Sequence, residues 1–392
     1  MAGKQRCRAL SCKKKYNIMA TAKAFQINVK QEVLNDLSAR LKNTRWTGEP
    51  QGAGWGYGTN STYLKELVNY WQTSYDWRKQ EEILNQLPHY TAVVNDITLH
   101  FIHIKGKASQ KKPLLLIHGW PDSFYRFNKI ISLLTAHDNS FDLIIPSIPG
   151  FGFSGHHAVS SDVTAEIFNK LMVESLGYNN YFIAGGDMGS VIAKSMANQF
   201  PQYVKAIHIT DVGYPDGTED WSSMSPAEQQ FGQLIQGWFF TEGAFNMIQS
   251  TKPQTLSYGL NDSPVGLAGW IIEKFNTWSD NDGDIENSFT KDELITNIMI
   301  YWVTQTINSS VRTYAENARA GYSGGLKSSQ KVNVPTGVSL FPKEAQFPQE
   351  WAERKVNLAS FTKLEKGGHF APMETPYVYA LELTRFFEKF DI

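Results

Sequence analysis

The sequence predicts an α/β protein with a mostly parallel central sheet and helices on both faces. From about residue 91 onward, short apolar runs alternate with helical stretches, and such runs suit strands that are buried in a parallel sheet. The alternation stops over residues 213–325 and then resumes. A glycine-rich turn that carries a single aspartate, Asp187, follows one of the apolar runs. These three observations predict the fold class and place a candidate site at the turn.

The first part of the chain is predicted to be helical with long connections. Apolar residues recur at helical spacing in residues 31–46 and again in residues 64–71, with a Gly/Trp-rich loop between them. We therefore assign residues 24–110 to a helical N-terminal extension that leads into the first strands. Residues 1–23 are predicted to be a basic, disordered tail, since such tails rarely join a core.

The strands of the predicted sheet follow in order. Alternating apolar residues near position 99 predict a half-buried strand. We assign residues 111–212 to the first part of the core and residues 326–392 to its C-terminal part, which ends in an amphipathic helix containing Tyr377, Leu381, Phe386 and Phe387. Continuous apolar runs predict buried strands at 113–117, 141–145, 181–184, 206–209, 334–341 and 358–364.

The interruption at residues 213–325 has helix-like spacing and no clear strand. Ligands of parallel sheets bind beyond the carboxyl ends of the strands. An insertion late in such a sheet is therefore predicted to form a helical lid over a ligand site.

Composition excludes several classes of function. The chain has 392 residues, with 37 Lys and Arg against 38 Asp and Glu, so no basic balance points to nucleic acid. Its two cysteines, Cys7 and Cys12, cannot build a disulfide framework or a four-ligand zinc site. No apolar run is long enough to span a membrane and no secretory signal is evident, so we expect a cytoplasmic protein without a metal or cofactor.

The sharpest local motif is Gly-Gly-Asp-Met-Gly at residues 185–189. It lies between a predicted strand and a predicted helix, which is the setting of a nucleophile elbow. Only small residues fit two positions before and after the nucleophile, and Gly185 and Gly189 occupy those positions. An aspartate can instead cap the following helix, so the motif alone leaves both interpretations open.

A carboxylate at the elbow changes the chemistry that the turn can support. A serine there would form an acyl-enzyme from an ester or amide, whereas Asp187 would attack a saturated carbon and become an alkyl ester. Its substrate must then carry a leaving group on that carbon, such as an epoxide oxygen or a halide. The absence of a serine in the elbow counts against an esterase.

Four further motifs follow predicted strands in a fixed order: His-Gly-Trp-Pro at 118–121, Pro-Gly-Phe-Gly-Phe-Ser at 149–154, Glu344, and Gly-Gly-His-Phe at 367–370. With the elbow they give the chain order nucleophile, acid, histidine. This set resembles the α/β-hydrolase fold, and within it the epoxide hydrolases of the microsomal and juvenile-hormone type. Segments 46–50, 75–78 and 261–266 resemble the N-terminal extension and lid of that family. The membrane-bound members have an anchor helix that this chain lacks, so we expect a soluble form.

The resemblance implies roles for individual residues. Asp187 would attack the epoxide, and His369, held by Glu344, would activate the water that hydrolyses the ester. Glu344 is chosen over Glu350 and Glu353 because it follows a strand end in the family's Phe-Pro-x-Glu pattern. The roles of the remaining residues follow from the same resemblance: Tyr314 as proton donor, the backbone N–H groups of Trp120 and Met188 as the oxyanion hole, and Phe245, Trp120 and Pro121 in the substrate pocket.

Two positions depart from the family pattern. Phe245 stands where the family has a second lid tyrosine, so one donor to the leaving oxygen is missing. The protein could work with Tyr314 alone, use another group such as Tyr258, or be slow on ordinary epoxides. Met188 stands where tryptophan is more common, but its backbone N–H is unchanged.

Three functions remain to be compared. The first is an epoxide hydrolase acting on a small hydrophobic epoxide and water, in a detoxification role. The second is a haloalkane dehalogenase, which shares the aspartate and the histidine but needs donors for a halide. The third is a catalytically weak or inactive binding protein, since fold alone does not fix function. A homodimer is possible, and no nucleic-acid partner or membrane span is expected.

Overall fold

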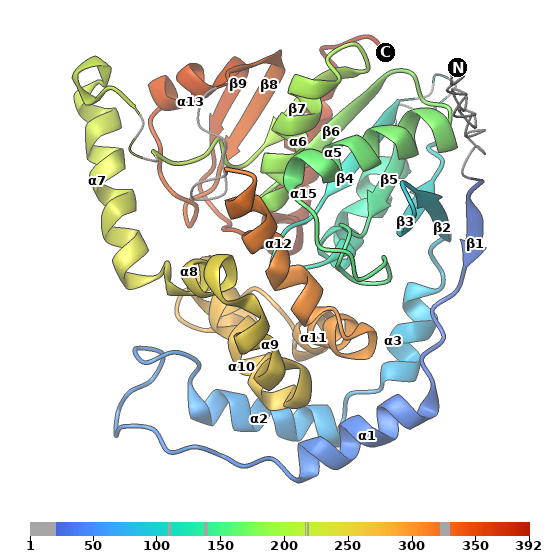
Figure 1. Cartoon of the computed structure of the whole chain (residues 1–392), viewed down its shortest axis with the longest axis vertical. Helices are drawn as coiled ribbons and strands as arrows, with labels where there is room; N and C mark the ends of the chain where they lie inside the picture. Colours follow the sequence, from blue (N-terminus) through green and yellow to red (C-terminus); the bar gives the residue numbers. More distant parts are fainter. Residues whose placement is uncertain are drawn as a thin grey trace, which may run out of the picture.

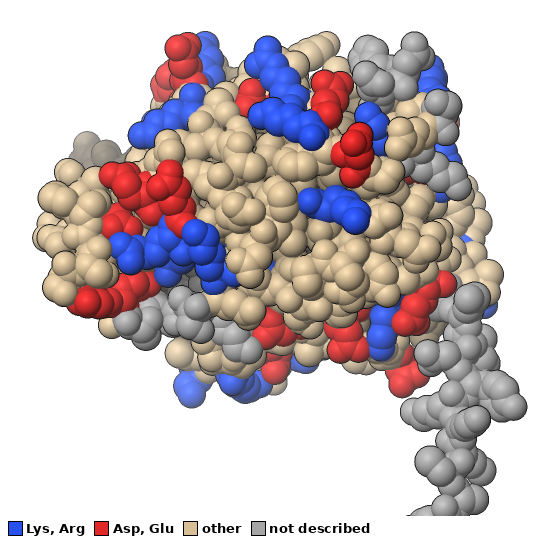
Figure 2. Space-filling view, turned by 90° about the horizontal axis from the view of Figure 1, so that it is seen from above, with Lys and Arg blue, Asp and Glu red and all other residues tan. Residues whose placement is uncertain are grey.

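The structure is a computed structural model that describes residues 21–108, 110, 112–136, 140–215, 217, 219–321 and 330–392. Most of the predicted N-terminal tail, including both cysteines, lies outside these residues. No helix among the described residues is long and apolar enough to cross a membrane. On the face shown in Figure 2, basic and acidic side chains are interspersed, so this face carries no extended patch of one sign.

Within the described residues, a nine-stranded sheet forms the centre of the molecule, with the order β1-β2-β3-β5-β4-β6-β7-β8-β9. The strands β1, β2, β3 and β5 pair antiparallel, and all the pairs from β5 to β9 are parallel. The strands are β1 (Lys23–Phe25), β2 (His89–Val94), β3 (Ile97–Ile104), β4 (Pro113–Ile117), β5 (Asp142–Pro146), β6 (Tyr181–Gly185), β7 (Val204–Ile209), β8 (Val332–Leu340) and β9 (Val356–Lys363).

The strand order reverses at β4. The chain passes from β4 to β5 on one side and then returns to β6 on the other side. Ligands of open α/β sheets bind at such a reversal, beyond the carboxyl ends of the strands. The topology therefore brings the segments after β4 and β6 together at the position where a site is expected.

Helices cover both faces of the sheet, and α5 and α6 lie against one face (Figure 1). These two helices pack against each other, and α6 also contacts β4, β6, β7 and β8. The helices of the core are η1 (Phe124–Ile130), α4 (Ile131–Thr135), α5 (Ser161–Lys170), the π-helical turn η2 (Leu171–Ser175), α6 (Met188–Gln199), α13 (Gln349–Lys355), α14 (Ala371–Glu374) and α15 (Pro376–Phe387).

Among the described residues between β7 and β8, six helices stand beyond the carboxyl edge of the sheet, and we call them the lid (Figure 1). Serine and threonine caps begin several of them, and both α7 and α11 start with a capping box. The lid consists of α7 (Pro226–Thr241), α8 (Ala244–Thr251), α9 (Pro253–Asp262), α10 (Pro264–Trp278), α11 (Lys291–Thr304) and α12 (Ile307–Arg319), with the short turns η3 (Trp221–Ser223) and η4 (Ile285–Asn287).

The N-terminal helices α1 (Gln31–Lys42), α2 (Ser61–Thr73) and α3 (Trp77–Leu84) pack against the lid on the side away from the sheet (Figure 1). The contacts include polar anchors. The Arg40 guanidinium pairs with Asp262 at 2.6 Å, and the Tyr70 hydroxyl donates to Asp292 at 3.0 Å. We call these three helices the N-terminal extension.

The predicted fold class is confirmed, and so are the predicted strands from residue 97 onward. Two strands, β1 and β2, were not predicted, because short strands at the antiparallel edge lack a continuous apolar run. The last helix buries Phe386 and Phe387 as predicted, together with Tyr379 and Leu383, whereas Tyr377 and Leu381 are exposed. The prediction for this helix is therefore confirmed at its C-terminal end and wrong at Tyr377 and Leu381.

Candidate active site

Asp187 occupies the turn between β6 and α6, with φ 55° and ψ −129°. A positive φ is strained for a residue with a side chain, and such strain is typical of functional sites. A Cβ on Gly185 would lie 2.6 Å from the carbonyl carbon of Gly189, and one on Gly189 would lie 2.1 Å from the Ile117 oxygen. The turn therefore requires glycine at both positions, and it presents Asp187 at the carboxyl edge of the sheet.

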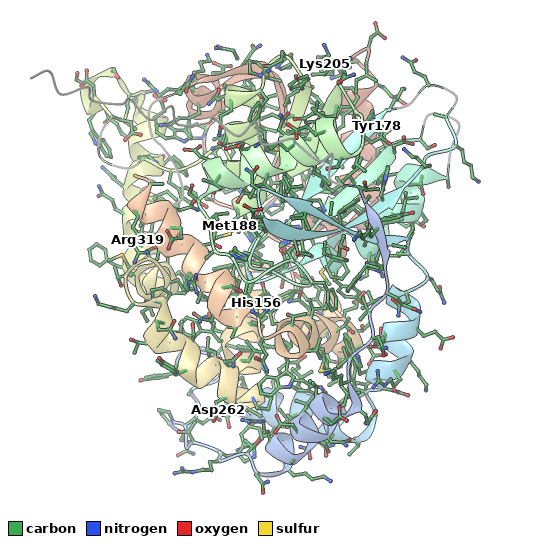
Figure 3. All side chains as sticks on the ribbon, turned by 45° about the vertical axis from the view of Figure 1, so that its right-hand side comes forward. His156, Tyr178, Met188, Lys205, Asp262 and Arg319 are labelled. Atoms are coloured by element: carbon green, nitrogen blue, oxygen red, sulfur yellow. The ribbon has the colours of Figure 1, made fainter. Side chains whose placement is uncertain are left out.

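Two backbone amides hold the Asp187 carboxylate. The N–H of Trp120, just after β4, donates to Asp187 Oδ1 at 2.9 Å. The N–H of Met188 also hydrogen-bonds to the carboxylate. The loop after β4 approaches so closely that a Cβ on Gly119 would lie 2.2 Å from Oδ1. Both predicted oxyanion-hole amides thus contact the Asp187 carboxylate, and Oδ2 faces His369. Met188 itself lies between the sheet and the lid helices (Figure 3).

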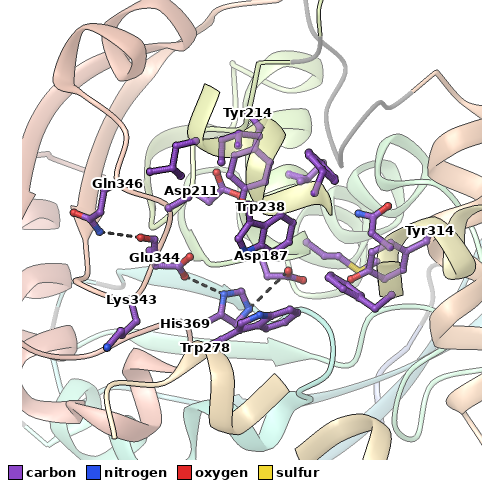
Figure 4. A pocket seen from close by; sticks show the side chains of 18 of the residues that line it. Asp187, Asp211, Tyr214, Trp238, Trp278, Tyr314, Lys343, Glu344, Gln346 and His369 are labelled. Carbon is purple, nitrogen blue, oxygen red and sulfur yellow. Dashed lines mark hydrogen bonds and ion pairs between the residues drawn. The ribbon is translucent and has the colours of Figure 1, made fainter. Parts of the chain in front are cut away.

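His369 follows β9 and reaches both acidic residues. Its Nδ1 lies 3.0 Å from Glu344 Oε1, and its Nε2 lies 3.8 Å from Asp187 Oδ2 (Figure 4). The Nε2 atom is buried and has no hydrogen-bond partner among the described residues. By contrast, Glu350 and Glu353 are exposed. The structure therefore brings together the three residues of the predicted triad.

The charges of this cluster shift its titration. Burial lowers the pKa of His369, but the nearby carboxylates of Glu344 and Asp187 raise it to about 9. Burial raises the pKa of Asp187, and the positive His369 and the two amides oppose that shift. The His369 side chain therefore favours its protonated form at neutral pH.

A cavity of about 290 Å³ opens beside Asp187, His369 and Glu344. Six of the residues in its wall carry Phe, Tyr or Trp rings, which suit a hydrophobic ligand. In Figure 4, Asp187 lies between His369 on one side and Tyr314 on the other. The aromatic residues of the wall are Tyr214, Trp238, Phe239, Phe245, Trp278 and Tyr314.

Tyr314 and Phe245 lie in the cavity wall, on α12 and α8. Their rings contact each other edge-on, with centroids 6.1 Å apart. Burial raises the pKa of Tyr314 well above its usual value, and the Asp187 carboxylate adds to this, so the phenol stays protonated. Trp120 and Pro121, which were also predicted for the pocket, are buried and do not belong to the described wall. The Trp120 ring instead stacks on Phe245 at 5.5 Å.

Tyr258 cannot replace the missing donor. It is 71% exposed and borders a separate cleft next to Arg40 and Asp262, not the cavity beside Asp187. The suggestion that Tyr258 serves the site is therefore wrong. The sequence could not show this, because the side of α9 that carries Tyr258 faces solvent, whereas Ser257 and Leu260 are buried.

The structure adds residues to this site that the sequence did not identify. Glu374 accepts hydrogen bonds from the N–H of Phe370 at 2.8 Å and from that of Asp280, beyond α10, at 2.7 Å. The Trp278 carbonyl accepts from the N–H of His369 at 2.9 Å. Asp211, after β7, also borders the cavity, and burial raises its pKa to about 6. The position of Asp211 at a strand end was a usable signal in the sequence.

Known proteins resemble this chain in sequence. Residues 22–127 match the family described as "Epoxide hydrolase N terminus", and residues 112–242 match "alpha/beta hydrolase fold". "Epoxide hydrolase 1" of Sus scrofa is 38% identical, over 92% of this chain and 87% of that protein. A "Putative epoxide hydrolase" of Stigmatella aurantiaca is also 38% identical, over 93% of this chain and 84% of that protein.

Solved structures resemble it in fold. The juvenile hormone epoxide hydrolase of Bombyx mori superposes with a TM-score of 0.82 at 33% identity, covering 94% of both chains. The epoxide hydrolase of Aspergillus niger gives a TM-score of 0.82 at 28% identity, over 95% of this chain and 97% of that one. Because these relatives share 38% identity over more than nine-tenths of the chain, the chain belongs to the epoxide hydrolase family.

Proposed function

We propose that this epoxide hydrolase converts an epoxide and water to a vicinal diol through a covalent ester on Asp187. The observation that carries the proposal is the position of the Asp187 carboxylate. Two amides hold it, and its Oδ2 faces a cavity that also contains His369 and Tyr314. The nucleophile, base and acid thus surround one space that can hold the substrate.

In the first step, Oδ2 attacks an epoxide carbon and the carbon–oxygen bond of the ring breaks. The leaving oxygen takes the proton of the Tyr314 hydroxyl, which is neutral because burial raises its pKa. Ester formation removes the negative charge of Asp187, and the pKa of His369 falls because that charge helped to raise it. The imidazolium can then return a proton to the tyrosinate and become a base.

In the second step, His369 takes a proton from a water molecule that attacks the carboxyl carbon of Asp187. The distance of 3.8 Å between His369 Nε2 and Asp187 Oδ2 is too long for a hydrogen bond, and the buried Nε2 has no other partner among the described residues. Nε2 is therefore free to accept the proton of this water. Glu344 orients the ring and stabilises its charge, and the Trp120 and Met188 amides stabilise the oxyanion. Collapse breaks the ester bond between the substrate oxygen and the Asp187 carboxyl carbon. The His369 imidazolium protonates the leaving alkoxide to give the diol, and the proton of the Asp187 acid then returns to His369.

The imidazole titration tests this charge coupling. We expect a His369 pKa of about 9 in the resting enzyme and a lower value in Asp187→Asn, because the substitution removes a negative charge that raises it. The measurement is an NMR titration of the ring nitrogens, with His369→Gln to identify the signal. An equal pKa in both proteins would contradict the coupling.

The variant Phe245→Tyr tests whether the missing second proton donor to the leaving epoxide oxygen limits the rate. A hydroxyl at this position would enter the cavity beside Tyr314, and we expect the alkylation rate to rise roughly 10-fold or more, since one oxyanion donor is worth about 10²–10³. Single-turnover kinetics measures it. The hydrolysis rate of the ester should not change, and an unchanged alkylation rate would mean that Tyr314 suffices.

The alternatives are tested by one assay on a panel of epoxides and haloalkanes. Diol formation supports the proposal, whereas halide release alone would favour a dehalogenase, and neither product would favour a binding protein. A single turnover in oxygen-18 water should place no label in the diol, because the first oxygen comes from Asp187. The hydrophobic substrate, the homodimer and the cytoplasmic location stay predictions.

A further inference from the structure

An ion pair lies buried beneath the active site. Arg126, on η1, and Asp122, just before it, are each 1% exposed, and the guanidinium Nη1 contacts Asp122 Oδ2. Burial disfavours the charged guanidinium, yet the carboxylate of Asp122 keeps the pKa of Arg126 above its usual value. A buried charge pair is weak support for stability by itself, so its other contacts decide what it does.

Those contacts join two separate loops of the site. Asp122 Oδ1 accepts the N–H of Gly119 at 2.9 Å, and the next residue, Trp120, supplies the amide on Asp187. Arg126 Nη2 donates to the carbonyl oxygen of His369 at 2.6 Å. The pair therefore connects the loop that carries the oxyanion donor with the loop that carries the base.

The pair is itself held in place from the lid. The Tyr301 hydroxyl, on α11, donates to the Asp122 carbonyl at 2.6 Å, and Asn297 Nδ2 donates to the Pro121 carbonyl at 2.8 Å. The guanidinium also packs under the elbow, since a Cβ on Gly186 would lie 2.8 Å from Arg126 Nη2. Little freedom remains for the two side chains to move apart.

We propose that Arg126, paired with Asp122, is a positioning residue that sets the geometry of ester hydrolysis. The inference rests on the proposed function. Alkylation uses Asp187 and Tyr314, and neither hydrogen-bonds to the pair directly, since the pair reaches Asp187 only through the loop that carries the Trp120 amide. Hydrolysis needs His369 and the Trp120 amide at the same carboxyl carbon, and the pair holds the backbone of both loops. A displacement of about 1 Å can cost roughly 10² in rate.

The positive charge of Arg126 also favours ester hydrolysis, because it lowers the pKa of His369. The carboxylates of Glu344 and Asp187 raise the pKa of His369, whereas Arg126 lowers it. Glu374, near the histidine, is a further carboxyl group coupled to it. Without the guanidinium, the imidazole of the ester intermediate would hold its proton to higher pH, and less of it would be available as base.

The test measures both half-reactions in Arg126→Met by rapid quench and mass spectrometry. We expect the hydrolysis rate constant to fall about 10²-fold while alkylation changes less than about threefold. The alkyl-enzyme should accumulate, and kcat and KM should fall together. The pH at which the hydrolysis rate reaches half of its maximum should rise. Arg126→Lys keeps the charge but cannot reach both partners, so it should slow hydrolysis without the pH shift.

Arg78→Met is the matched control. Arg78 also contacts a carboxylate, Glu81 at 2.5 Å, and a backbone carbonyl, that of Val29 at 2.7 Å, but it lies in the N-terminal extension. It should leave the ratio of the two rates unchanged. If Arg126→Met does not fold, the ratio of the hydrolysis rate to the alkylation rate can be measured in the double variant Asp122→Asn/Arg126→Met, which leaves no unpaired charge.

Two results would overturn the inference. Equal loss in both half-reactions would show a general structural role, and no loss in hydrolysis would show no role. The proposed function fails by a different result, namely no alkyl-enzyme in any variant, including His369→Gln.

Discussion

Replacing Asp187 with alanine should abolish diol formation, with a loss in kcat of about 10⁴-fold or more. The carboxylate is the one group in the proposed mechanism that bonds to the substrate carbon, and the neighbouring amides cannot replace it. The measurement is diol production by purified protein over several hours, with product detected by mass spectrometry. Normal turnover by this variant would refute the covalent mechanism.

The same variant should fold at least as well as the wild type. It removes a carboxylate whose charge is disfavoured by burial, although the strained backbone at φ 55° remains. Thermal unfolding of both proteins checks this, and a stable, inactive variant separates lost chemistry from lost structure. Glu350→Gln, at an exposed carboxyl close to Glu344 in sequence, should keep full activity as the control.

Replacing His369 with glutamine should trap the ester on Asp187. The alkylation step does not need the base, so we expect one substrate mass added to the intact protein within a single turnover. Hydrolysis should slow by about 10³-fold or more, because no other described group lies where Nε2 lies to activate water. Intact-mass spectrometry after rapid mixing with a hydrophobic epoxide measures both steps.

The adduct must map to Asp187. Proteolysis should place the added mass on the peptide that contains residues 185–189, and the double variant Asp187→Ala/His369→Gln should carry none. Diol formation at the wild-type rate without any adduct would contradict the assigned roles of both residues.

The sequence predicted the fold because its main signals are local. Apolar runs marked the buried strands, and the elbow at 185–189 shows its steric requirement in the sequence itself. The strands β1 and β2 gave no such signal, since only three of their nine positions are buried and no two of these are consecutive. Tyr377 and Leu381 of the last helix were placed on its buried face in error, because apolar side chains also occur on the exposed side of a helix and only the packed structure distinguishes the two.

The site was predictable where one residue type at a strand end determines the chemistry. Glu344 and His369 could be chosen in that way, and they lie 3.0 Å apart. Arg126 could not, because its partner carbonyl at His369 is distant in sequence and any residue supplies a carbonyl. Phe245 was recognised as a departure, but only the structure shows that Tyr258 is too far outside to compensate.

The N-terminal extension contacts the side of the lid that faces away from the sheet. These contacts include the ion pair Arg40–Asp262 and the hydrogen bond Tyr70–Asp292. On the other side, α7 and α8 expose Phe240 and Met247 to solvent. Residues of α7 and α8 such as Leu234, Trp238 and Phe245 line the cavity, so we expect epoxide to enter and diol to leave beside these two helices and not beneath the extension.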